Sequence, residues 1–144
     1  MQAMMLYPMF AMVLLTIAVG VLMVKQRYRA VMENGVSPAY FKLNRGGRLP
    51  EYLVRTTQHY DNLFETPLLF YAGVLSILVL QQTDWVYLLL GWLYVLSRLA
   101  HAYVHIVINR LKLRRRVFLV SVWLLVFIWL RLALEPLMSW LLYR

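Results

Sequence analysis

The chain contains no cysteine, and charged residues make up only 15% of its 144 positions. Without a thiol, disulfides, thiolate nucleophiles and zinc–thiolate sites are excluded. Soluble domains carry roughly 25% charged and roughly 45–50% apolar residues. This chain is 62% apolar, with a mean hydropathy of +0.65. Its length leaves room for one domain, and its composition predicts a small integral membrane protein.

Acidic residues are also scarce, with 6 against 15 lysines and arginines. Most of the basic residues lie in two stretches between apolar segments: Lys25, Arg27, Arg29, Lys42, Arg45, Arg48 and Arg55, then Arg110, Lys112, Arg114, Arg115 and Arg116. Cytoplasmic loops carry such an excess, so we expect both stretches to be cytoplasmic and both termini to lie outside. Basic and aromatic residues are not interleaved on a soluble face, and we expect no nucleic-acid partner.

Four apolar segments have the length of about 20 residues that a spanning helix needs. They lie at about residues 4–24, 59–80, 85–108 and 117–140. We therefore predict an all-α integral membrane protein, with residues 1–144 forming a single four-helix transmembrane bundle. The cytoplasmic loops are expected at about residues 29–57 and 109–116. The first loop is expected to include a helical extension of the first span and an irregular stretch around residues 44–47, and residues 81–84 a tight antiparallel turn.

Polar residues interrupt the second and third spans. Asn62 and Glu65 lie near the start of the second span, and Arg98, His101 and His105 lie near the end of the third. Ionisable groups inside a membrane are costly, which makes each a candidate functional residue. At about 1.5 Å of rise per residue, Glu65 and His101 lie roughly 15 Å and 13 Å from the cytoplasmic ends of their helices. The two sets are therefore expected to form one pocket that suits a small anionic or zwitterionic ligand.

Other interpretations of these residues remain open. Arg98 could be a purely structural partner of Glu65, because buried membrane charges usually pair. His101 and His105, four residues apart, could bind a metal together with Asp61 or Glu65, although no metal site is assigned from the sequence.

Two further polar features have simpler interpretations. His59 is expected to be interfacial, near the membrane surface. Arg131 and Glu135 in the fourth span, also four residues apart, are expected to form a local ion pair.

The run Asn62-Leu63-Phe64-Glu65-Thr66-Pro67, followed by Arg98-x-x-His101-x-x-x-His105, resembles the membrane-associated proteins in eicosanoid and glutathione metabolism, the MAPEG family. The resemblance extends over essentially the whole chain, and the motif is most similar to that of bacterial members. It implies a homotrimer of four-helix protomers that binds glutathione between protomers near the cytoplasmic side. It also implies a multi-pass protein of the bacterial inner membrane.

The resemblance further implies roles for individual residues. Asn62 and Glu65 match a pair that holds glutathione, with Glu65 taking its amino group. Arg98 and His101 match positions that line the same site. Arg114 falls where the family has an arginine that stabilises the glutathione thiolate, which makes it the candidate catalytic residue.

Several positions match less well or depart from the family pattern. Arg27 is a looser match to a basic residue at the end of the first span. His105, also a candidate ligand-binding residue, stands where a tyrosine is common. Gln58 and Asp61 replace two arginines of the fuller motif, so that only Arg55 remains upstream. Fewer cations would face the carboxylates of glutathione.

Two functions follow. The first is a glutathione-dependent membrane transferase or peroxidase that acts on lipophilic electrophiles or lipid hydroperoxides. The alternative is a non-catalytic protein of the same family that serves as a ligand-binding or accessory subunit of a larger membrane complex. In both cases the expected partners are membrane lipid and further copies of the chain. The enzyme would also bind a lipophilic small-molecule substrate.

Overall fold

The computed structural model describes residues 2–43 and 47–142, and the described residues are helical with no strand. Residues 44–46 of the stretch that was predicted to be irregular lie outside this description. In chain order the elements are η1 (Gln2–Met5), α1 (Leu6–Asn34), α2 (Tyr40–Leu43), α3 (Glu51–Asn62), α4 (Thr66–Val79), α5 (Trp85–Tyr103), η2 (Val104–Ile108) and α6 (Leu111–Leu142).

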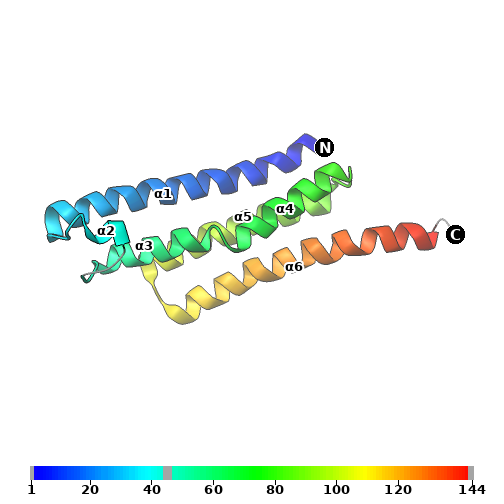
Figure 1. Cartoon of the computed structure of the whole chain (residues 1–144). Helices are drawn as coiled ribbons and strands as arrows, with labels where there is room; N and C mark the ends of the chain where they lie inside the picture. The colour runs from blue at the N-terminus through cyan, green and yellow to red at the C-terminus, as the bar shows by residue number, and fades with distance from the viewer. Residues whose placement is uncertain (1, 44–46, 143–144) are drawn as a thin grey trace.

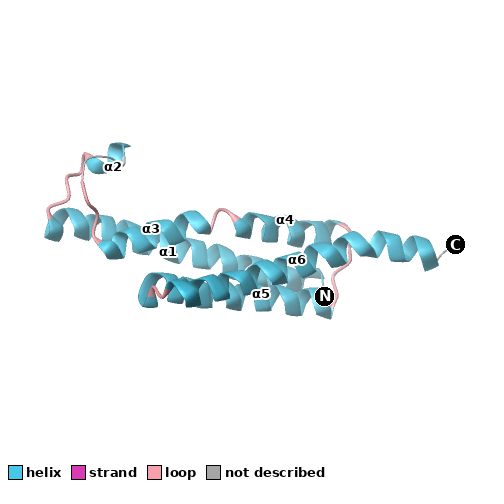
Figure 2. Ribbon diagram, turned by 90° about the horizontal axis from the view of Figure 1, so that it is seen from below, coloured by secondary structure: helices cyan, strands magenta, loops and turns pink. Residues whose placement is uncertain are grey.

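The long helices run up and down beside one another (Figure 1). α3 and α4 follow each other as one rod, so that α1, the α3–α4 rod, α5 and α6 alternate in direction (Figures 1 and 2). Both ends of the chain lie at one end of the molecule, together with the turn between α4 and α5. The two connections near the basic stretches lie at the opposite end. The predicted helical extension of the first span is confirmed, because α1 continues to Asn34.

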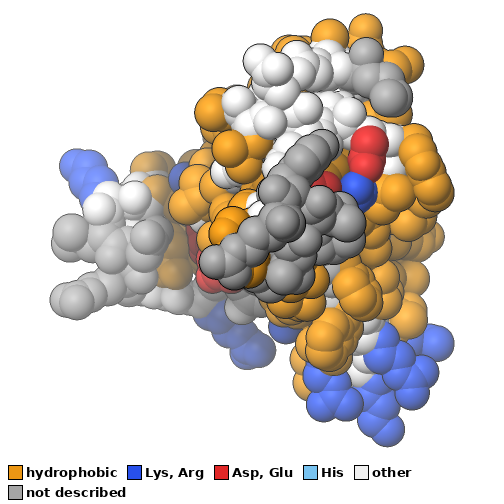
Figure 3. Space-filling model, turned by 90° about the vertical axis from the view of Figure 1, so that its right-hand side faces the viewer, with side chains coloured by type: hydrophobic (Ala, Val, Ile, Leu, Met, Phe, Trp, Pro, Cys, Tyr) orange, Lys and Arg blue, Asp and Glu red, His pale blue; other side chains and the backbone are white. Residues whose placement is uncertain are grey.

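Within the described residues, three helices are long and apolar enough to cross a membrane: Gln2–Asn34, Glu51–Val79 and Leu111–Pro136. α5 has 19 residues and lies beside them. Its most apolar stretch is less apolar than theirs, and the helix contains Arg98 and His101. Figure 3 views the end that bears the termini, and apolar side chains dominate the visible flanks. Such an apolar exterior is what a lipid environment requires.

The core between the helices combines aliphatic side chains with aromatic rings and methionines. Phe70 of α4 stacks on Tyr94 of α5, with ring centroids 4.3 Å apart, and both residues are fully buried. Gly91 lets α5 approach the start of the chain, because a Cβ atom there would lie 3.2 Å from both Met5 and Pro8. Small residues at such crossings are the usual means by which membrane helices pack closely.

The rod formed by α3 and α4 is interrupted at residues 63–65, which form a turn. Pro67 lies in the first turn of α4. It has no N–H to donate to the carbonyl four residues earlier, and its ring clashes with that carbonyl. The helix therefore stops at Asn62 and restarts at Thr66. This break leaves the Asn62 carbonyl without a donor from its own helix and available to another group.

A second irregularity follows α5. Residues Val104–Ile108 form a π-helical turn, closed by a hydrogen bond of 2.7 Å from the Asn109 N–H to the Val104 carbonyl. Asn109 ends the turn with a φ of 52°, in the left-handed region that asparagine tolerates better than most residues. Single π turns within helices are often found at functional sites, and this one contains His105.

An ion network joins helices at the end that bears the termini. Arg131 contacts both Asp84 carboxylate oxygens and lies 3.3 Å from Glu135, which confirms the predicted local pair. Asp84 also caps α5, because its side chain accepts a hydrogen bond of 2.9 Å from the Tyr87 N–H. The tight turn between α4 and α5, also predicted, is thereby tied to α6.

We expect Asp84→Ala to cost more stability than Asp84→Asn. Asparagine caps a helix as well as aspartate does, so the Asn variant loses only the ion pair, whereas alanine also loses a cap worth about 1 kcal/mol. Thermal unfolding in detergent measures both. Equal losses in the two variants would mean that the cap contributes nothing.

The same network predicts a pH effect. The hydrogen bond from Arg131 holds the pKa of the Asp84 carboxyl below its usual value. A lowered pKa stabilises the folded state above the unfolded-state pKa of about 3.9, and this contribution is lost as pH falls through the folded value. The difference in melting temperature between the wild type and Asp84→Asn should therefore be constant near neutrality and shrink below about pH 4.

Candidate functional site

A polar pocket of about 290 Å³ lies where α3 ends, α5 passes into η2 and α6 begins. Its walls combine polar and apolar side chains: Asn62, His101, His105, Leu111, Arg114, Arg115 and Phe118. Five of the seven are polar or charged, and no carboxylate is among them. The pocket therefore suits a ligand with negative charge.

Arg98 is fully buried beside this pocket. Its Nη2 donates to the backbone carbonyl and to the side-chain Oδ1 of Asn62, each at 3.3 Å. The guanidinium carbon lies 5.9 Å from the centre of the Phe118 ring, which itself lines the pocket. Its Nε and Nη1 have no hydrogen-bond partner within the described part of the chain. A buried arginine with unpaired donors is costly unless an anion supplies the acceptors.

Among the described residues, hydrogen bonds link Glu65 to Arg98 through Asn62. The Asn62 side chain donates to the Glu65 carboxylate at 3.2 Å while its carbonyl oxygens accept from Arg98. In the described ranges 2–43 and 47–142, no ion pair joins Glu65 to Arg98. Glu65 is exposed, so its carboxylate is accessible to a cationic group. This arrangement does not support the interpretation of Glu65 and Arg98 as a structural pair.

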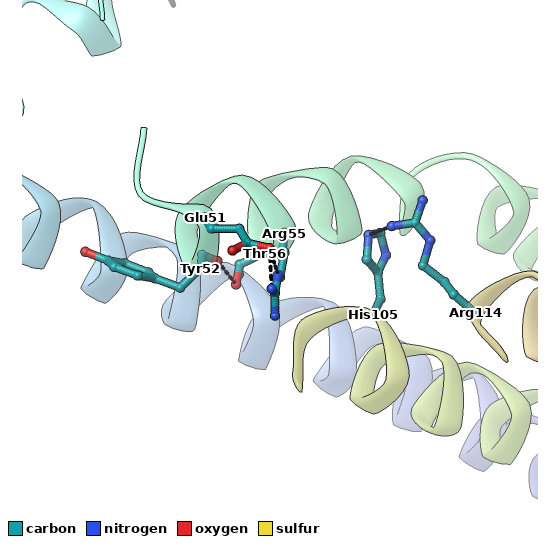
Figure 4. Close-up of polar contacts among 6 residues, drawn as sticks. All are labelled: Glu51, Tyr52, Arg55, Thr56, His105 and Arg114. Atoms are coloured by element: carbon teal, nitrogen blue, oxygen red, sulfur yellow. Dashed lines mark hydrogen bonds and ion pairs between the residues drawn. The ribbon is translucent and has the colours of Figure 1, made fainter. Parts of the chain in front are cut away.

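Arg114 reaches His105 from the start of α6, with Nη1 2.8 Å from the ring nitrogen Nε2 (Figure 4). A guanidinium can only donate, so Nε2 must accept and His105 is neutral, with its proton on Nδ1. Arg114 is half-buried and lines the pocket. It therefore presents a fixed positive charge at the pocket wall, oriented by a neutral imidazole.

His59 is fully buried, and the expectation that it is interfacial is wrong. Its ring centroid lies 5.3 Å from that of His101 and 5.3 Å from that of His105. The signal was present in the sequence, because His59 precedes Asn62 by three residues and so shares its helix face. That face packs against the end of α5 and against η2, so the ring is enclosed by protein.

The remaining candidates lie away from the pocket walls. The Arg27 guanidinium is 5.5 Å from the Phe41 ring, where α1 meets the first connection. Gln58 and Asp61, the two departures from the family motif, are exposed on α3. Arg55 donates from Nε to Glu51 at 3.1 Å (Figure 4). A single chain thus brings Asn62, Arg98, His101, His105 and Arg114 together, with Glu65 beside them, and leaves Arg27 elsewhere.

A second cavity, of about 380 Å³, is almost wholly apolar and lies between α1 and α4. Leu63 and Phe64, next to the helix break, line one part of it, and Met9, Val13, Leu68, Tyr71 and Leu75 line most of the rest. It is open toward the apolar exterior, where Val13, Phe64 and Leu68 are exposed. This groove can accept the apolar part of a lipophilic molecule.

One comparison with known proteins agrees with the motif. No curated protein and no solved structure matches the chain. A family model described as the MAPEG family matches residues 5–134, which include the four long helical rods up to Leu134 and every residue of the polar pocket. The chain belongs to the MAPEG family.

Proposed function

We propose that this protein is a glutathione-dependent membrane transferase or peroxidase that acts on lipophilic electrophiles or lipid hydroperoxides. The observation that carries the proposal is the buried Arg98, whose Nε and Nη1 lack partners in the described chain, next to a pocket that also contains Arg114. Membership of the MAPEG family supports glutathione as the ligand and a homotrimer as the assembly.

The residues present fit a zwitterionic peptide. Arg98 has free donors for a carboxylate, the exposed Glu65 carboxylate can accept from an amino group, and Asn62 holds both in place. When bound, glutathione supplies the sulfur nucleophile. Arg114 would stabilise its thiolate form, because a fixed cation favours the ionised thiol. No nucleophile from the protein is required, in agreement with the absence of cysteine.

The second substrate would come from the bilayer. The groove between α1 and α4 is apolar and passes Leu63 and Phe64, which follow Asn62 directly in the chain. A lipophilic molecule held there would therefore lie near the polar site without crossing water. We further propose that the protein lies in a bacterial inner membrane with both termini outside, which agrees with the location of both basic connections at the end opposite the termini.

A second candidate function rests on Gln58 and Asp61. Both are exposed on α3, where the family motif has arginines, and Asp61 adds a negative charge that repels carboxylates. A chain that has lost these cations could serve as a ligand-binding or accessory subunit without catalysis. Binding without turnover would favour this alternative.

Glutathione binding to the purified protein tests the proposal. We expect a saturable rise in melting temperature, because a ligand at 100 times its dissociation constant stabilises the native state by about 2.7 kcal/mol. Glu65→Ala should reduce this shift strongly. Glu33→Ala is the matched control, since Glu33 is an exposed carboxylate that pairs with Arg29 far along α1, and it should leave the shift unchanged.

The same preparation allows the assembly to be measured by native mass spectrometry, where we expect three copies.

If millimolar glutathione produces no shift in the melting temperature of the wild type, the proposed ligand is wrong. If the shift is present but no electrophile or hydroperoxide is turned over, the accessory subunit becomes the better description.

A further inference from the structure

We propose that His59, His101 and His105 bind one divalent transition metal ion of the zinc class, with an anion from the adjacent pocket as the fourth ligand. The inference does not rest on glutathione binding. It concerns a cluster that the sequence did not reveal, because His59 was expected elsewhere.

The three histidines are all that the chain contains. They come from three different elements, α3, α5 and η2, and all three are buried. One ring nitrogen from each lies within 4.8 Å of the others. Three imidazoles on one ion, with an open fourth position, is a ligand set found in catalytic zinc sites.

The ring nitrogens need a partner that the described chain does not provide. Both nitrogens of His59, Nδ1 of His101 and Nδ1 of His105 are buried without a hydrogen bond to described protein atoms. Each such buried group destabilises the fold if it stays unsatisfied. A shared cation would satisfy one nitrogen of His59 and one of His101. At His105 it would take Nε2, the unprotonated nitrogen, in place of the contact with Arg114.

The geometry is close to what a tetrahedral ion requires. Zinc–nitrogen bonds of about 2.0–2.1 Å separate ligand nitrogens by about 3.3 Å. The observed separations of up to 4.8 Å exceed this value by an amount that side-chain rotation can close. The ring centroids, 5.3–5.5 Å apart, already surround a common point.

The surrounding charge determines which ligand completes the site. Arg114 contacts His105 directly, and Arg98 lies one helical turn before His101. Two fixed cations oppose a bare dication but favour a metal that carries a negatively charged ligand. His101 and His105 line the polar pocket, so that such a ligand can approach from it. Asp61 and Glu65, the acidic ligands considered from the sequence, are exposed and are not needed.

Cobalt(II) provides the direct test, because tetrahedral Co²⁺ with nitrogen ligands absorbs strongly in the visible range. The full-length protein is purified in detergent without a histidine tag, stripped with a chelator, and titrated with CoCl₂ in chloride buffer. We expect intense bands that saturate at one Co²⁺ per chain and are displaced by Zn²⁺, with zinc content confirmed by elemental analysis. Weak octahedral bands only, or no uptake at micromolar metal, would overturn the proposal.

Variants assign the signal to the cluster. His59→Phe and His105→Phe each keep an aromatic ring in the core but remove a ligand, and each should lower metal affinity at least 100-fold. Asp61→Asn is the matched control and should bind as the wild type does. Binding that survives both histidine variants would overturn the proposal, because the metal would then be on other groups. If neither variant folds, the wild-type spectrum and stoichiometry still decide.

The outcome is separable from that of the proposed function. Metal is titrated in the absence of glutathione, and the glutathione shift is measured in excess chelator. Either result can therefore fail without the other.

Discussion

Replacing Arg98 by methionine is expected to weaken glutathione binding strongly while leaving the folded protein at least as stable as before. Arg98 is fully buried, and its Nε and Nη1 are unpaired within the described residues. Removal of an incompletely paired buried charge in favour of an apolar side chain of similar length is often neutral or stabilising. The Asn62 carbonyl that loses its donor is only half-buried, so water can replace the guanidinium.

The expected loss of affinity is at least 100-fold, which corresponds to about 2.7 kcal/mol. This is the size expected when one or two hydrogen bonds to a charged group are lost. Isothermal titration gives the affinity, and thermal unfolding without ligand gives the stability. An Arg98→Met protein that unfolds several degrees lower, with binding lost in proportion, would instead establish a structural role for Arg98.

Arg131→Met is an informative control because its expected pattern is the reverse. Arg131 contacts Asp84 and Glu135 at the far end of the bundle. Its removal leaves two acidic side chains without their cation, so stability should fall while glutathione affinity stays the same. The two arginine variants together distinguish a ligand-binding cation from a structural one.

Arg114→Ala is expected to reduce turnover by about 100- to 1000-fold, the cost of removing one preorganised charge-stabilising group from an active site. The effect rests on the proposed glutathione chemistry and is measured with an aryl halide electrophile. Arg114 lines the pocket, with Nη1 2.8 Å from the ring nitrogen Nε2 of His105. Without its charge, a smaller fraction of the bound thiol is ionised at neutral pH, which ultraviolet absorbance of the thiolate reports.

Two matched variants test the role of Arg114. Arg116→Ala removes the same charge two residues later, from an exposed side chain that does not line the pocket, and should leave turnover near the wild-type value. Arg114→Lys keeps the charge but not the planar donor geometry, so partial recovery is expected. A loss of glutathione affinity with unchanged turnover at saturation would show that Arg114 binds the ligand but does not activate it.

The approach of the two polar sets could be predicted from the sequence with little more than the rise of a helix. Counting from the basic ends placed the polar residues of the second and third spans at one level, and the contact between Asn62 and Arg98 agrees with that count. The calculation works because helix rise is constant and the membrane forces backbone hydrogen bonds to be satisfied locally. The apolar exterior could be predicted from the composition, because 62% of the residues are apolar.

The partners of each side chain could not be predicted in this way. His59 was placed at the surface by its position near a span end, whereas its helix face directs it into the core. The alternative of a direct pair between Glu65 and Arg98 is not observed, because the turn at residues 63–65 directs Glu65 outward and leaves Asn62 between them. Helical periodicity assigns a face only while the helix is regular, and both the break and the π turn change that assignment.

The break after Asn62 also sets how deep the polar site lies in the membrane. A regular helix pairs its interior carbonyls, and the backbone acceptor that Arg98 uses is free because the rod is broken between Asn62 and Thr66, next to Pro67. Moving that proline by one turn would shift the released carbonyl by about 5.4 Å along the bilayer normal. Arg98 would then face a paired backbone. The position of this break therefore sets the depth of the backbone acceptor, and a chain with Pro67 relocated would keep only the Asn62 side chain as an acceptor for Arg98.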